Sequence, residues 1–183
     1  MATLFQRRVD QEWRLLEGLA AENNGLHLVD RSHDGVDAQF TVSFTTTTGL
    51  VRDPDGNIQT VTQHDARFRF PAFFPSVPIE AFVERVFHPN VDPVNGFACL
   101  WTRASAGDTI VEAVRRLQRV LAWEALNDTP DHVMQPEALA WYRDPSRIMR
   151  LPLPFDPIRP PASPEAAHPI DAIPGHPRRR RLV

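Results

Sequence analysis

The sequence predicts an α+β fold in which an N-terminal helix precedes a four-stranded antiparallel meander, followed by a turn-rich loop and further helices. Apolar residues recur at helical spacing near the N-terminus and again after residue 108, whereas they alternate with polar residues over 36–44. The connections between the predicted strands are too short to contain crossover helices, so neighbouring strands are expected to run antiparallel.

The N-terminal helix is predicted from an apolar stripe that stops at Asn23-Asn24-Gly25, a typical helix end. The stripe consists of Phe5, Val9, Trp13, Leu16 and Ala20. Three arginines, Arg7, Arg8 and Arg14, lie off this stripe and are expected on the outer face of the helix.

The clearest strand is 36–44, where the alternation is typical of a sheet with one buried face. A turn is expected at residues 53–57, because Pro54 sets one backbone angle and Gly56 allows a positive one. Prolines interrupt residues 71–78 before the last strand. The four predicted strands cover residues 26–31, 36–44, 58–70 and 79–86.

A second long helix is expected to start at Asp108, a suitable N-cap. Its buried side would consist of Ile110, Val114, Leu117 and Leu121, and its outer side of Arg115, Arg116 and Arg119. A polar turn over 127–132 leads to a last helix near Pro136. We expect the folded domain to cover 1–147 and a Pro/Arg-rich tail, extended or disordered, to cover 148–183.

Composition narrows the classes of function. The 183-residue chain has a net charge of −3, so it has no general attraction to nucleic acid or anionic membranes. Its single cysteine excludes an internal disulfide and a multi-thiolate metal site, and favours a reducing compartment. No segment is long and apolar enough to span a bilayer. We therefore expect a cytoplasmic protein without a metal, a cofactor or a membrane partner.

The single cysteine, Cys99, closes the turn-rich loop HPNVDPVNGFAC (88–99). It follows the tight-turn pair Asn95-Gly96, which brings its backbone to the surface. Asn90 is presented by an earlier turn, and its neutral amide is suited to stabilising an oxyanion. A thiol beside an amide, without an obvious paired base, suits holding an acyl group as a thioester better than it suits peptide hydrolysis.

His-Pro-Asn followed by Asn-Gly-x-x-Cys-Leu resembles the active-site loop of the ubiquitin-conjugating enzymes, and the order of predicted elements over residues 1–145 is also similar. The resemblance implies that Cys99 accepts the C-terminal glycine of a ubiquitin-like modifier from an activating enzyme, where ATP is used, and passes it to a substrate amine. It implies that Asn90 helps the oxyanion or holds the loop in shape, and that His88 and Pro89 support the loop.

The resemblance also places an acidic residue in the turn before the last helix, near the incoming amine. Asp131 and His132 are the candidates, because a carboxylate can position an ammonium and an imidazole can accept a proton; Asp128 is a third. Arg7, Arg8 and Arg14 correspond to the face that meets the activating enzyme, or form only a solvated helix face.

Several features depart from the family pattern. The loop from Asn90 to Cys99 is one residue longer, and Trp101 stands where an acidic residue is common. Residues 103–107 replace the usual ligase-docking loop, which leaves the need for a ligase open. All 20 basic residues are arginine. Codon bias explains this. Selection against self-modification also explains it, because an enzyme loaded with its modifier could transfer the modifier to its own lysines. Together these features indicate a divergent, bacterial relative of the kind found in antiviral operons.

Three other functions compete with this interpretation. The same fold includes interaction modules that lack the cysteine and only bind. A thiol hydrolase could use Cys99 with His88 or His132. The four arginines at 178–181 could contact phosphates, but the body has no matching basic or aromatic platform, so nucleic acid is not favoured as a partner.

Overall fold

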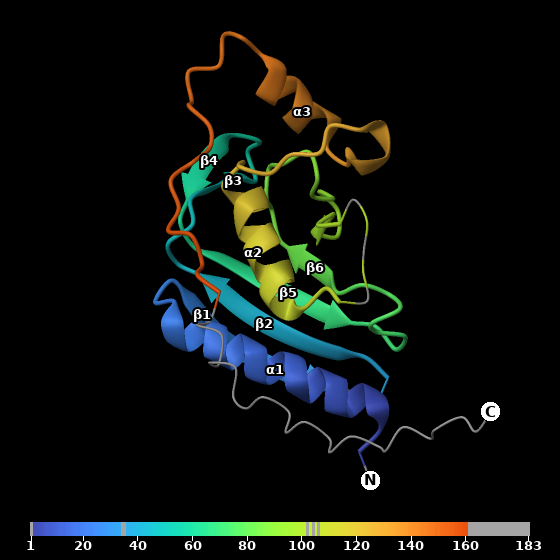
Figure 1. Ribbon diagram of the computed structural model, residues 1–183. Helices are drawn as coiled ribbons and strands as arrows, with labels where there is room; N and C mark the ends of the chain where they lie inside the picture. The colour runs from blue at the N-terminus through green and yellow to red at the C-terminus, as the bar shows by residue number, and fades with distance from the viewer. Residues whose placement is uncertain (1, 34–35, 102, 104, 106, 161–183) are drawn as a thin grey trace, which may run out of the picture.

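The computed structural model describes residues 2–33, 36–101, 103, 105 and 107–160. Two long helices, α1 (Leu4–Glu22) and α2 (Ile110–Leu121), pack against each other and cover one face of an antiparallel sheet (Figure 1). A shorter helix, α3 (Pro136–Arg143), lies beyond the end of α2 (Figure 1). None of the helices in the described part of the chain is long and apolar enough to cross a membrane.

The main sheet confirms the predicted antiparallel meander. Its strands in spatial order are β1 (Leu26–His33), β2 (Ala38–Phe44), β5 (His64–Phe70), β6 (Glu80–Val83) and β7 (Phe97–Ala98). Every neighbouring pair is antiparallel. The short strand β7, which the sequence did not predict, runs directly into the cysteine.

The single strand predicted over 58–70 is wrong. Its first part, β4 (Ile58–Val61), pairs with β3 (Gly49–Arg52) in a separate two-stranded sheet, and β5 starts only at His64. The predicted turn at residues 53–57 is present between β3 and β4, and Asp53 accepts a 2.8 Å hydrogen bond from the backbone of Asn57. The chain thus leaves the main sheet and returns to it within the consecutive polar residues 62–65.

The core lies between the sheet and the two long helices. Phe40 of β2 pairs in register with Phe68 of β5, and both side chains are fully buried. The predicted stripe of α2 is also buried: Ile110, Val114, Leu117 and Leu121. Each large apolar side chain removed from water contributes about 1.5–3 kcal/mol, so this layer fixes how α2 lies behind the cysteine loop.

A buried carboxylate joins the two long helices. Glu12 of α1 has no solvent exposure and accepts a 2.8 Å hydrogen bond from the backbone N–H of Ile110. Arg8 lies 3.1 Å from its other oxygen. The predicted N-cap at Asp108 is therefore wrong: Thr109 precedes the helix, its side chain makes no cap, and Glu12 satisfies the free N–H from outside. Burial raises the pKa of Glu12.

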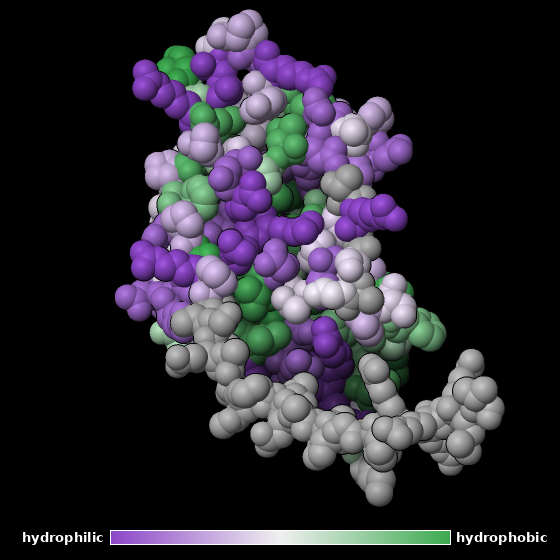
Figure 2. Space-filling model, in the orientation of Figure 1, coloured by the Kyte–Doolittle hydropathy of each residue, from purple (hydrophilic) through white to green (hydrophobic). Residues whose placement is uncertain are grey.

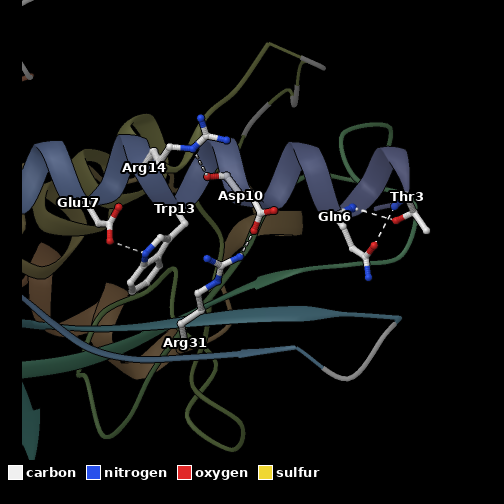
Figure 3. A network of polar contacts seen from close by, with 7 residues as sticks. All are labelled: Thr3, Gln6, Asp10, Trp13, Arg14, Glu17 and Arg31. Atoms are coloured by element: carbon white, nitrogen blue, oxygen red, sulfur yellow. Dashed lines mark hydrogen bonds and ion pairs between the residues drawn. The ribbon is translucent and has the colours of Figure 1, made fainter. Parts of the chain in front are cut away.

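The other side of α1 is tied to strand β1. Asp10 pairs with Arg31, whose guanidinium lies 5.4 Å above the ring of Trp13. Trp13 in turn donates a 2.7 Å hydrogen bond to Glu17. Figure 3 shows this network, which comprises Thr3, Gln6, Asp10, Trp13, Arg14, Glu17 and Arg31. Of these contacts, those of Arg31 with Asp10 and Trp13 join α1 to β1, and the others lie within α1 and its N-cap.

Residues 151–160, here called the C-terminal strap, run extended along the body (Figure 1). Gln118 of α2, which is buried, holds the strap by donating to the Asp156 carbonyl at 2.8 Å and accepting from the Ile158 N–H at 2.9 Å. The strap is extended as expected, but the folded body continues beyond the predicted limit of residue 147. The rest of the predicted tail, 161–183, lies outside the described residues.

Candidate functional site

The loop before Cys99 is built to hold one conformation. Gly96 has a φ of +76°, and a Cβ added there would lie 2.5 Å from the Val83 carbonyl oxygen. The carboxylate of Asp92 accepts a 2.8 Å hydrogen bond from the backbone of Val94. Cys99 itself donates its N–H to the Asn90 carbonyl at 2.9 Å. The thiol therefore has a fixed position, half-buried, at the end of β7.

His88 and Pro89 are the first residues of this loop, and both are buried. The ring Nδ1 of buried His88 accepts the backbone N–H of Asn90 at 3.1 Å. Burial lowers the pKa of His88 to about 3, so its ring stays neutral and can accept that bond. The carbonyl of Pro89 accepts a 2.7 Å bond from Met134. These contacts support the predicted bracing role.

The side-chain amide of Asn90 is fully engaged. Its nitrogen donates to the carbonyls of Asn127 at 2.6 Å and His132 at 2.8 Å, and its oxygen accepts the Asn127 N–H at 2.8 Å. An amide nitrogen has only two hydrogens to donate. Both are used in the turn over 127–132, so this geometry supports holding the loop in shape rather than donating to an oxyanion.

The thiol of Cys99 contacts an imidazole, with 3.0 Å between its Sγ and the Nδ1 of His132. His132 is the last residue of a short 3₁₀ helix, η1 (Pro130–His132), and its backbone carbonyl is one of the groups that Asn90 holds. Burial raises the pKa of the Cys99 thiol, which favours the protonated S–H. The expectation that the thiol lacks a paired base is therefore wrong.

The two other candidates in the same turn are placed differently. Asp131 has an exposed side chain and does not line the cavity beside the thiol. Asp128 forms an ion pair with Arg143 at 2.9 Å on the surface. Of the three residues that the sequence left open, only His132 touches Cys99.

A cavity of about 180 Å³ opens beside the thiol. This volume is below that of most small-molecule sites and suits a single side chain or the end of a peptide. Its lining includes Cys99, Leu100, Trp101, Arg116, Val120, Leu126 and His132.

The wall formed by Trp101 and Arg116 was not predicted as part of the site. The guanidinium of Arg116 lies 4.5 Å above the ring of Trp101, and the indole N–H donates to the Ile79 carbonyl at 2.9 Å. The sequence showed Trp101 only as a departure from a family pattern and Arg116 as an outward residue of α2. Their stacking depends on tertiary packing, so no local sequence pattern predicts it. Figure 2 shows that the surface around α2 is mostly hydrophilic, with scattered apolar areas.

The three arginines of α1 do not share one environment. Arg7 and Arg14 are exposed, and Arg14 contacts only the backbone of Asp10 in its own helix, at 3.2 Å. Arg8 instead pairs with buried Glu12 and lies 5.7 Å above the ring of Phe74. Arg7 and Arg14 are therefore the more exposed of the three arginines.

The described part of the chain thus has the fold of the ubiquitin-conjugating enzymes, with a half-buried cysteine at the position of the predicted active-site loop. No protein-family model matches the sequence, and no curated protein matches it. A solved structure described as "Ubiquitin conjugating enzyme (putative) from Trypanosoma cruzi" superimposes with a TM-score of 0.54 and 16% sequence identity, covering 80% of this chain and 95% of that chain. This similarity confirms the predicted fold class.

Proposed function

We propose that the chain is a conjugating enzyme that accepts a ubiquitin-like modifier as a thioester on Cys99 and transfers it to a substrate amine. The observation that carries the proposal is the half-buried thiol of Cys99 at the end of its loop, beside a small cavity, in this fold. The partners are the modifier, an activating enzyme that uses the ATP, and a substrate protein, with or without a ligase. The predicted setting is a reducing, bacterial cytoplasm, where a single thiol stays free.

In the charging step, Cys99 Sγ attacks the carbonyl carbon of the modifier's thioester with the activating enzyme. The thiol proton passes to His132 Nδ1, and the activating enzyme's sulfur leaves with the electron pair and takes up a proton. One thioester replaces another, so the reaction has little net driving force and the placement of the thiol decides its rate. The exposed Arg7 and Arg14 would meet the activating enzyme on the outer face of α1.

In the discharge step, a substrate amine attacks the same carbonyl carbon and Cys99 sulfur leaves. Asn90 contributes by holding the turn that carries His132, and Asp131 or His132 takes part in removing the ammonium proton. The absence of lysine from the sequence supports the proposal, because an enzyme that carries the modifier then has no lysine side chain of its own to modify.

The Cys99–His132 contact also favours a second candidate, a thiol hydrolase, because a histidine beside the thiol is what such an enzyme needs. His88 does not supply that partner: its ring is fully buried and accepts the Asn90 N–H. A hydrolase would release free acyl product instead of carrying it.

Mixing the protein with ATP and candidate pairs of activating enzyme and modifier, then measuring its intact mass, tests these functions together. A modifier-sized adduct that dithiothreitol removes supports the carrier. Release of free acid from an activated modifier without any adduct supports the hydrolase. Binding of an activating enzyme loaded with its modifier, without an adduct on this protein and without release of free modifier, would indicate a non-catalytic interaction module of the same fold.

A further inference from the structure

We propose that this site also transfers its acyl group to hydroxyl groups, with His132 as the general base that deprotonates the incoming alcohol. The inference rests on the proposed carrier function and extends its acceptors beyond amines to serine or threonine side chains and other alcohols. It is carried by the imidazole held 3.0 Å from the sulfur that bears the acyl group.

The backbone of His132 is held independently of the thiol. Its N–H donates to the Thr129 carbonyl at 2.9 Å, and its carbonyl accepts from Asn90 at 2.8 Å. The ring itself contacts the sulfur through Nδ1. When Cys99 is acylated, its sulfur has no proton to donate, so Nδ1 is available to an incoming hydroxyl.

The two classes of acceptor need different help from the enzyme. An amine that has lost its ammonium proton is already a good nucleophile, so a carboxylate that positions it is sufficient. A hydroxyl is a poor nucleophile until its proton is removed during attack, which requires a base whose pKa lies near the working pH. An imidazole meets this requirement and an ordinary carboxylate does not. The site therefore contains a stronger base than amine transfer demands.

The reaction is balanced without a further reagent. The alcohol oxygen forms a bond to the thioester carbonyl carbon while its proton moves to His132 Nδ1. The C–S bond breaks, its electron pair goes to Cys99 Sγ, and His132 returns the proton to that sulfur. The products are an oxyester and the free thiol.

The charged groups around His132 leave its ring available. In its own turn, Asp131 points to solvent and Asp128 is paired with Arg143. From α2, two arginines line the same cavity, Arg116 over the Trp101 ring and Arg119 paired with Glu124 at 2.8 Å. Among the described residues that line this cavity, none is a carboxylate.

The test separates charging from acceptor choice. Cys99 is first loaded from the 2-mercaptoethanesulfonate thioester of an acyl-Gly-Gly peptide, and intact mass reports the adduct. The loaded protein is then mixed with N-acetylserine amide or with Nα-acetyllysine amide, and the products are separated by mass and by hydroxylamine, which cleaves esters and not amides. We expect both products from the unaltered protein.

His132→Gln should lower the rate of ester formation at least tenfold and lower amide formation less, because only the hydroxyl needs the base. His27→Gln, at an exposed histidine of β1, is the matched control and should change neither rate.

Two results would overturn the inference while leaving the carrier function standing: a loaded protein that makes only the amide, or ester formation that His132→Gln leaves unchanged. Failure of Cys99 to load at all would contradict the carrier function itself, and the inference with it.

Discussion

Replacing Asn90 with alanine tests whether this residue holds the active-site turn. The substitution removes three hydrogen bonds, of 2.6, 2.8 and 2.8 Å, that join the His-Pro-Asn segment to Asn127 and His132. At roughly 0.5–1.5 kcal/mol net for each bond, the expected loss in free energy of unfolding is about 2–4 kcal/mol. Urea unfolding of the two proteins measures it.

The same variant should also lose charging and discharge together, because the turn that carries His132 is no longer held against Cys99. Asn95→Ala is the matched control: its side chain accepts one exposed 2.7 Å bond from Phe97, so its loss should stay near 1 kcal/mol or below. A variant Asn90→Ala with unchanged stability and normal charging, but without discharge, would refute this reasoning and support an oxyanion role.

Three further predictions concern the fold around the site. Gly96→Ala should destabilise by more than Gly56→Ala in chemical unfolding, since both residues have positive φ (+76° and +87°) but only the Cβ at Gly96 meets a backbone oxygen at 2.5 Å. Burial raises the pKa of Glu12 in the folded protein, so its contribution to stability is present below the unfolded value of 4.5 and is lost as pH rises through the folded pKa. Thermal unfolding at a series of pH values should therefore show that Glu12→Gln gains stability relative to the unaltered protein over this pH range. Gln118→Met should lower the free energy of unfolding by about 2 kcal/mol and make the C-terminal strap sensitive to limited proteolysis, whereas an unchanged digestion pattern would contradict the anchoring role.

The sequence predicted the features that depend on local pattern. The apolar stripe of α2 and the alternation of β2 appear where the periodicity predicted them, because a buried face requires apolar residues at a regular spacing. The turns at Asn95-Gly96 and at Pro54-Asp55-Gly56 also form as expected, because their backbone angles depend on the residues of the turn itself. The cysteine loop was recognisable for the same reason.

Other features depend on groups that meet only in the folded chain. Glu12 lies on the buried face of α1, three residues after Val9 and four before Leu16, but the spacing does not show that its carboxylate accepts from the N-terminus of α2. The break between β4 and β5 follows from the pairing of β4 with β3, and it falls at the consecutive polar residues 62–65, where the alternation of 66–70 stops. The choice of His132 over Asp131 depends on which way a single 3₁₀ turn faces, and residue spacing does not specify that.

The central claim is that Cys99 carries an acyl group, and the bond formed there is its most direct test. Cys99→Ser should convert the adduct made with ATP and an active pair of activating enzyme and modifier from a thioester, which dithiothreitol cleaves, into an oxyester with the same mass increment, which dithiothreitol leaves intact. Intact mass spectrometry before and after reduction distinguishes the two bonds. An adduct that responds to dithiothreitol in the same way in both proteins would show that the modifier is attached elsewhere, and would contradict the account.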